Sequence, residues 1–262
     1  MSSITIGVIG NYFGHLSSAE NVHESEIPSG IFIIDQNASS LTNGDATHYP
    51  ERGSKVDIEP EFVIRYTIEY TDNKVSKLIP LQLTVGNDVT IRSLEGATKI
   101  SSRKSWGQAS KGIHPTWWSI NQIDNLNNLS LVSYIERDGE EAHLTTQPLR
   151  IDEMKLFGQA LDTWMVEAIN GQQEHGIFDE ILPTLAAQGY PEELILYTGA
   201  PNYTTWGTEN FLQPGDSMHI IGYKTDNFSD EQIDNLFKEN KLVGLTNVLY
   251  LKQQMVEPAL VD

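Results

Sequence analysis

The sequence of 262 residues contains no cysteine. Disulfides, thiolate nucleophiles and zinc sites built on cysteine are therefore excluded, although this absence does not fix the cellular compartment. Basic residues are scarce as well, because 17 Lys and Arg stand against 36 Asp and Glu and the formal net charge is -19. Nucleic acids and anionic membranes both attract cationic surfaces. We therefore expect a protein that binds neither nucleic acid nor a membrane.

Long hydrophobic runs are missing too. No segment approaches the ~18 consecutive apolar residues of a membrane-spanning helix, and the first residues lack the cationic start and apolar stretch of a secretory signal. We therefore expect a cytoplasmic protein. Hydrophobic residues make up 39% of the chain, which is enough for a sizeable core, and no repeat or low-complexity linker divides the sequence. These features predict a single domain over residues 1–262.

Segments that alternate between apolar and polar residues, or are rich in β-branched residues, predict a β-dominated fold. The expected strands are 4–9, 30–35, 56–70, 78–89, 194–199 and 218–224, with a hairpin within 128–149. The expected helices are 150–170, 229–240 and, more weakly, 177–188. Ser229 and Gln232 have the spacing of a capping box, whereas Pro183 interrupts the weaker helix. Residues 36–55 have the composition of a loop. Together these segments predict an α+β fold.

Two carboxylates lie close together in the expected strand 56–70. Glu59 and Glu61 are two positions apart, so a strand places both side chains on the same face. Neighbouring apolar residues indicate burial, and buried like charges repel each other. Either this face is solvated, or a cation lies between the two carboxylates. Pro60 is compatible with an edge strand or a bulge and leaves both interpretations open.

The segment 85–107 combines a carboxylate with several cations. Asp88 ends an expected strand and could complete an oxygen-only ligand set with Glu59 and Glu61, which would suit Mg²⁺, Mn²⁺ or Ca²⁺. Arg92 and Lys104 could then bind the carboxylate of a substrate. The alternative is a basic loop that balances an acidic surface.

A histidine near the start of the chain is a third candidate. His15 could act as a general base if a carboxylate orients it, or it could lie on the surface of a loop. Gly7, Gly10 and Gly14, followed by a second strand that ends in Asp35, resemble a dinucleotide-binding unit only superficially. The glycines do not have the G-x-G-x-x-G spacing, so we do not expect that function.

Taken together, these motifs resemble those of the fumarylacetoacetase superfamily. The matching segments follow the order of that superfamily and span nearly the whole chain. They are GNYFGH (10–15), EPE (59–61), NDVTIR (87–92), KSW (104–106), TGAP (198–201) and LQPGD (212–216). The resemblance implies the mixed β-roll of that superfamily with flanking helices, a segment within about residues 1–50 that includes a lid, and a homodimer.

The resemblance also implies a metal site and a substrate class. Glu59, Glu61 and Asp88 would hold one Mg²⁺ or Mn²⁺, with Ca²⁺ as a substitute in crystals. The metal would chelate a small anionic keto acid, a 1,3-dicarbonyl or 2-oxo acid. Arg92 and Lys104 would face the charge of this substrate, and Lys104 would also take part in catalysis.

Further roles in the reaction follow from the same resemblance. His15 would activate water or move a proton from the lid, with Glu20 or Glu209 as its partner carboxylate. Thr198 and the backbone of Gly199 would line the carboxylate end of the substrate. The implied activity is metal-dependent hydrolysis of a C–C bond in a β-diketo acid.

The chain departs from the superfamily pattern at several positions. Ser18 stands where small members carry the lid glutamate, Val8 stands where larger members add a metal-binding aspartate, and Ala200 replaces a threonine. The segment 34–37 lacks a lysine that small members often carry there. These departures leave two alternatives: a β-keto acid decarboxylase or isomerase on the same scaffold, and a non-catalytic ligand-binding protein that retains the fold.

Overall fold

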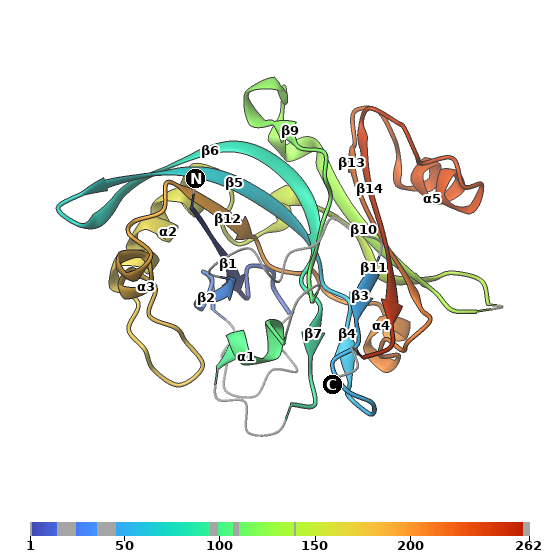
Figure 1. Cartoon of the computed structure of the whole chain (residues 1–262). Helices are drawn as coiled ribbons and strands as arrows, with labels where there is room; N and C mark the ends of the chain where they lie inside the picture. The colour runs from blue at the N-terminus through green and yellow to red at the C-terminus, as the bar shows by residue number, and fades with distance from the viewer. Residues whose placement is uncertain are drawn as a thin grey trace.

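Two β-sheets pack against each other in the computed structural model, which describes residues 2–14, 25–35, 46–94, 99–106, 110–138 and 140–258 (Figure 1). In the order of their pairing, the strands of the first sheet are β2 (Gly30–Asp35), β1 (Ser3–Ile9), β12 (Glu193–Tyr197), β5 (Pro60–Thr71), β6 (Lys74–Asn87) and β8 (Gly112–Ile113), and β9 (Trp118–Ser119) also pairs with β6. The strands of the second sheet are β11 (His143–Arg150), β10 (Leu129–Glu136), β13 (Ser217–Lys224), β14 (Val248–Val256) and β3 (Ala46–His48). A short antiparallel pair, β4 (Val56–Asp57) and β7 (Thr90–Ile91), completes the sheet structure that is described.

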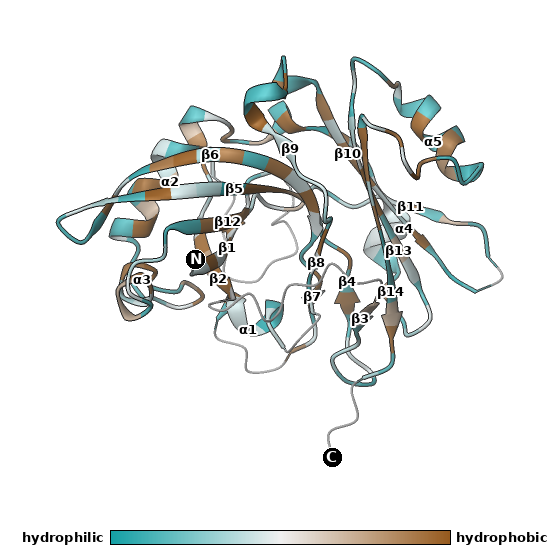
Figure 2. Cartoon of the chain, turned by 45° about the horizontal axis from the view of Figure 1, so that its top comes forward, coloured by the Kyte–Doolittle hydropathy of each residue, from teal (hydrophilic) through white to brown (hydrophobic). Residues whose placement is uncertain are grey.

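Both sheets are mixed. β1 is parallel to β12 and β14 is parallel to β3, whereas the other pairings are antiparallel. The long strands β5 and β6 of the first sheet are strongly curved and reach the second sheet at one end (Figure 1). Hydrophobic residues concentrate on the strands, while the connecting turns are mostly hydrophilic (Figure 2). This arrangement confirms the expected α+β class.

Most of the expected strands are confirmed, but two strands of the second sheet were not predicted. β3 lies within the segment 36–55 that was expected to be a loop, and it pairs with β14. β14 has a weak pattern because Gln253 points into the core, where its Oε1 accepts a hydrogen bond from Asn87 Nδ2 at 3.2 Å. A buried polar pair of this kind hides the apolar alternation of a strand.

The long helix expected at 150–170 begins later than predicted. Residues Ile151–Glu153 form a 3₁₀ turn, and α2 spans only Gln159–Gly171. Asn11 holds the intervening segment in a non-helical form, since its side chain bonds the backbone N–H of Leu156 at 3.0 Å and the carbonyl at 3.1 Å. Gly158 precedes α2 with a positive φ of 59°. Tertiary hydrogen bonds therefore override the helical periodicity here.

Helices flank the two sheets on opposite sides. α2 and α3 (Leu182–Ala187) lie beside the first sheet, and α5 (Asp230–Lys238) lies beside the second (Figure 1).

The expected capping box at Ser229 and Gln232 is confirmed. Pro183 lies in the first turn of α3, directly after its first residue Leu182, where a missing N–H costs little, so it does not interrupt the helix. Two five-residue helices, α1 (Ile100–Lys104) and α4 (Thr205–Glu209), were not predicted. No helix of the described residues is long and apolar enough to cross a membrane.

Arg137 explains the late LQPGD motif. Its Nε lies 2.8 Å from Asp216 Oδ1 and its Nη2 lies 2.9 Å from Oδ2, while Nη2 also donates to the carbonyl of Phe211 at 3.0 Å. Asp216 is 1% exposed, and its Oδ2 also accepts from the N–H of Gln213 at 2.8 Å. The buried carboxylate therefore fixes the turn before β13.

We expect Arg137→Lys to lower the free energy of unfolding by about 1–2 kcal/mol, because lysine cannot form the two parallel bonds of the guanidinium. Urea unfolding at neutral pH measures the change. Arg52→Lys is the matched control, since the Arg52–Glu257 pair is exposed and should contribute little. Equal effects of the two substitutions would contradict the structural role of Arg137.

A buried histidine makes the second sheet sensitive to acid. His219 of β13 is 2% exposed, its Nδ1 lies 2.7 Å from Tyr250 Oη, and its ring meets Phe237 of α5 edge-on. Burial lowers the pKa of His219 to about 4, and the charge of Lys252 acts in the same direction. The unfolded chain, with a histidine pKa near 6.5, therefore binds a proton that the folded protein excludes between about pH 6.5 and pH 4.

We expect stability to fall as the pH drops through this window, and His219→Gln should remove about 2–3 kcal/mol of the loss between pH 7 and pH 4.5. Urea unfolding at the two pH values measures this difference for the wild type and the variant. His175→Gln, at an exposed position, is the control. The interpretation fails if the stability difference between the two pH values is the same in all three proteins.

Candidate metal centre

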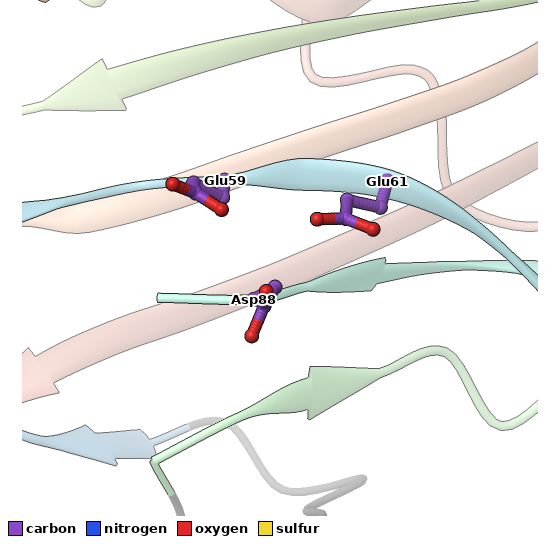
Figure 3. A group of neighbouring side chains, drawn as sticks. All are labelled: Glu59, Glu61 and Asp88. Carbon is purple, nitrogen blue, oxygen red and sulfur yellow. The ribbon is translucent and has the colours of Figure 1, made fainter. Parts of the chain in front are cut away.

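Three carboxylates meet where β5 begins and β6 ends. Glu59 and Glu61 flank the first residue of β5, and Asp88 follows the last residue of β6 (Figure 3). Each side chain offers one oxygen, and these oxygens lie within 4.8 Å of one another. Glu59 and Glu61 are 2% exposed and Asp88 is 0% exposed. The structure therefore brings the three expected carboxylates together, and their burial excludes a solvated strand face.

The pairing of β5 with β6 produces this convergence. Pro60 pairs with Asn87 in the antiparallel register, so Glu59 faces Asp88 across the two strands. The N–H of Asp88 donates to the carbonyl of Glu59 at 2.8 Å, and the N–H of Glu59 donates to Asn87 Oδ1 at 3.1 Å. β5 lies between β12 and β6, so of the two settings compatible with Pro60, an edge strand or a bulge, the edge strand is excluded. Pro60 is tolerated because it is the first residue of the strand.

The two predicted cations lie directly beside these carboxylates. Lys104, at the end of α1, is 7% exposed, and its Nζ donates to both Glu59 Oε2 and Asp88 Oδ2. Arg92 Nη2 donates to Glu59 Oε1 at 2.6 Å, and its Nε donates to Asp57 Oδ2 at 2.7 Å. Lys104 and Arg92 therefore compensate part of the buried negative charge.

A second lysine was not predicted. Lys111 is 0% exposed, its Nζ lies 2.8 Å from Asp88 Oδ1, and it donates to the carbonyl of Val89 at 2.7 Å. Its ammonium also lies 5.1 Å from the centre of the Trp106 ring. Burial lowers the pKa of Lys111 to about 8. No pattern in the sequence marks this residue, because its role depends on the tertiary contact that brings it beside Asp88.

Asp57 was also missed, although the sequence contains a signal for it. Asp57, Glu59 and Glu61 alternate along an expected strand, and that spacing predicts a shared face for all three. Asp57 is 8% exposed and pairs with Arg92. Burial raises the pKa of Asp57, although Arg92 opposes this effect. Asp57 therefore orients Arg92 and adds to the charge of the cluster.

Glu61 carries the least compensated charge of the group. Burial raises the pKa of Glu61 well above its usual range, and the charges of Asp88 and Glu59 act in the same direction. The N–H of Gly199 donates to Glu61 Oε2 at 2.7 Å. Within the described part of the chain, Glu61 forms no salt bridge. Lys104 responds in the opposite sense: burial acts to lower its pKa, but the three carboxylates outweigh burial and raise it.

This donor set suits a hard divalent ion. Three carboxylates supply only oxygen ligands, which Mg²⁺, Mn²⁺ and Ca²⁺ prefer. A divalent ion beside Glu61 would offset a negative charge that is costly to keep in the interior. The residues present therefore fit the divalent metal that the sequence resemblance implies.

The predicted substrate-binding residues of the TGAP motif form hydrogen bonds with the first residues of β5. Thr198 is buried, its Oγ1 donates to the carbonyl of Phe62 at 2.9 Å, and its own carbonyl accepts from Asn11 Nδ2 at 2.9 Å. Gly199 has a φ of +103°, which favours glycine and turns its N–H toward Glu61. Through Asn11, the TGAP motif is linked to the first motif, GNYFGH.

The predicted proton-transfer residues are not assembled in the described structure. His15 and Glu20 lie outside the described residues. Glu209 is exposed at the end of α4, a helix that packs against β11 of the second sheet. The pairing of His15 with Glu20 or Glu209 therefore stays a prediction.

Comparison with solved structures supports the fold. 2-keto-3-deoxy-D-arabinonate dehydratase, solved with magnesium and 2,5-dioxopentanoate, shares 15% identity and has a TM-score of 0.61 over 99% of this chain and 74% of its own. 5-carboxymethyl-2-hydroxymuconate delta-isomerase from Mycobacterium smegmatis shares 16% identity, with a TM-score of 0.59 over 99% and 80% of the two chains. Maleylpyruvate hydrolase from Sphingobium sp. SYK-6 shares 15% identity, with a TM-score of 0.55 over 97% and 71%.

These three structures are members of the fumarylacetoacetase superfamily, so the expected β-roll of that type is confirmed. At such low identity the likeness establishes the fold alone. No curated protein matches the chain. One family model matches residues 21–255, which is most of the sequence. The chain belongs to the family of unknown function DUF5718.

Proposed function

We propose that the protein is a divalent-metal-dependent enzyme that acts on a small anionic keto acid. The observation that carries this proposal is the buried cluster of Glu59, Glu61 and Asp88, with Arg92 and Lys104 directly beside it. The names of the similar structures agree with this class of chemistry, since they include a dehydratase solved with magnesium and 2,5-dioxopentanoate and a maleylpyruvate hydrolase.

The carboxylates of the cluster would bind the metal, and the cations beside it would bind the substrate. Glu59, Glu61 and Asp88 would hold Mg²⁺ or Mn²⁺, which would act as a Lewis acid on the carbonyl oxygens of the substrate. Lys104 bonds the oxygens of Glu59 and Asp88 that a bound ion would use, so its ammonium would then have hydrogen-bond donors available for a substrate carboxylate. Arg92, oriented by Asp57, would add a second positive charge.

Within this class we propose hydrolysis of a C–C bond in a 1,3-dicarbonyl acid. His15 would take a proton from the attacking water, with Glu20 or Glu209 to orient its ring, and Thr198 and Gly199 would lie near the carboxylate end of the substrate. Incubation of the Mg²⁺ form with acylpyruvates and acylacetoacetates tests the reaction. Absence of turnover with every substrate, in folded protein with metal bound, would reject it.

Isomerisation or decarboxylation of a β-keto acid is the second candidate. An isomerase and a dehydratase share the fold with the hydrolase named above, so the scaffold accommodates more than one outcome. Proton NMR of the products, with oxaloacetate as one substrate, separates decarboxylation and isomerisation from hydrolysis. Ligand-induced thermal stabilisation without any turnover would instead indicate a binding protein, an alternative that Ser18 in place of the lid glutamate favours.

We also propose that residues 1–262 form one catalytic domain, with the lid within about residues 1–50, and that two copies associate as a homodimer in the cytoplasm. Light scattering of the purified protein measures the mass in solution. A monomeric mass at micromolar concentration would reject the dimer without affecting the proposed chemistry.

A further inference from the structure

Lys111 is a buried cation that the proposed reaction does not use. It comes from the segment after α1 and approaches Asp88 at Oδ1, whereas Lys104 approaches the same carboxylate at Oδ2. Its side chain is 0% exposed and lies beside the ring of Trp106, so the ammonium has little solvent to screen it. A full positive charge in this position affects every charged species that enters the site.

The charges of the cluster nearly cancel before any ion binds. Among the described residues, the three cluster carboxylates and Asp57 provide the negative charge, and Arg92, Lys104 and Lys111 provide the positive charge. With all seven groups ionised, one negative charge is in excess. A divalent ion reverses the sign and leaves one positive charge in excess, whereas without Lys111 the same loaded site would be neutral.

We propose that Lys111 is a specificity-determining residue that weakens metal binding but makes the metal-loaded site favour ligands with two negative charges, such as keto acids with a second carboxylate. This inference rests on the proposed metal-dependent function. The two effects have opposite signs because the ammonium repels a divalent cation and attracts an anion. A lysine that only supported the fold would not produce opposite signs.

Titration calorimetry with Mn²⁺ at pH 6.5, followed by oxalate or oxamate added to the Mn²⁺-loaded protein, measures both effects. Oxalate carries two negative charges and oxamate one, so comparing the two measures how the affinity of the loaded protein depends on ligand charge. Lys111→Met removes the ammonium and keeps most of the volume. Lys111→Gln keeps an N–H donor for the carbonyl of Val89, so it serves as a second variant if Lys111→Met does not fold. Lys238→Met, at an exposed position on α5, is the control for loss of one charge.

We expect both Lys111 variants to bind Mn²⁺ about tenfold more tightly, and the loaded variants to bind oxalate about tenfold more weakly with a smaller loss for oxamate. Lys238→Met should match the wild type. The inference about Lys111 is overturned if the affinities for Mn²⁺ and oxalate fall together or remain unchanged, or if neither variant folds. None of these results would affect the proposed function. A wild-type protein that binds no Mn²⁺ would instead reject the proposed function.

Discussion

Replacing Glu61 by glutamine should abolish most of the metal affinity while leaving the metal-free protein at least as stable as the wild type. Substitutions that only perturb the partners of a metal ligand cost 10–100-fold in affinity, so loss of a ligand carboxylate should cost at least about 100-fold for Mn²⁺. The amide oxygen of the substituted side chain can still accept the hydrogen bond from the N–H of Gly199. Titration calorimetry measures the affinity, and urea unfolding without metal measures the stability.

The stability part of this prediction follows from the raised pKa of Glu61. An acid whose pKa is higher in the folded state binds more protons folded than unfolded, so its contribution to stability falls as the pH rises above about 4.5. At pH 7, Glu61→Gln removes this cost. Glu69→Gln, an exposed position on the same strand, is the matched control and should change neither quantity. Unchanged Mn²⁺ binding in Glu61→Gln would eliminate the carboxylate cluster as the metal site.

The carboxylate cluster could be predicted because it depends on local rules. A strand places residues two apart on one face, which brings Glu59 and Glu61 together whatever the rest of the fold. Asp88 joins them because β5 and β6 form a hairpin, and the short turn at Asp72 and Asn73 sets the register that places the beginning of one strand beside the end of the other. The remaining motifs follow the order of the superfamily along the chain, and that order supported the resemblance.

Lys111 and the start of α2 could not be predicted because they depend on long-range contacts. Lys111 lies 23 positions after Asp88 in the sequence and meets it only after the chain has formed α1 and returned. Residues 154–158 fit a helical pattern, yet Asn11, which is separated from Leu156 by 145 positions in the sequence, holds them in another conformation. In both cases a buried polar interaction decides the structure, and hydrophobic periodicity carries no information about it.

The cations of the site differ in how much a bound ion would change their surroundings. Arg92 and Lys104 are both fixed by bonds to the cluster, so their positions follow from the described structure. Lys104 is the residue whose role changes most when an ion binds, because it bridges two of the ligand carboxylates in the metal-free protein. Its substitution should therefore have different consequences with and without metal.

We expect Lys104→Met to lower the free energy of unfolding of the metal-free protein by about 3–5 kcal/mol, since removing one partner of a buried ion pair leaves uncompensated charge on Glu59 and Asp88. Saturating Mn²⁺ should restore most of the loss, because a divalent ion supplies the missing positive charge to the same carboxylates. Urea unfolding with and without Mn²⁺ measures both numbers, and turnover of any substrate found for the wild type should fall sharply.

Lys99→Met is the control for this substitution. Lys99 precedes the same helix, and its ammonium pairs with the largely exposed Glu174 and donates to the carbonyl of Phe178. Its loss should cost about 1 kcal/mol or less and should not respond to Mn²⁺. If metal-free Lys104→Met proved as stable as the wild type, Lys104 would not be neutralising Glu59 and Asp88. If Mn²⁺ stabilised Lys104→Met no more than Lys99→Met, the ion and the ammonium would not be competing for the same oxygens.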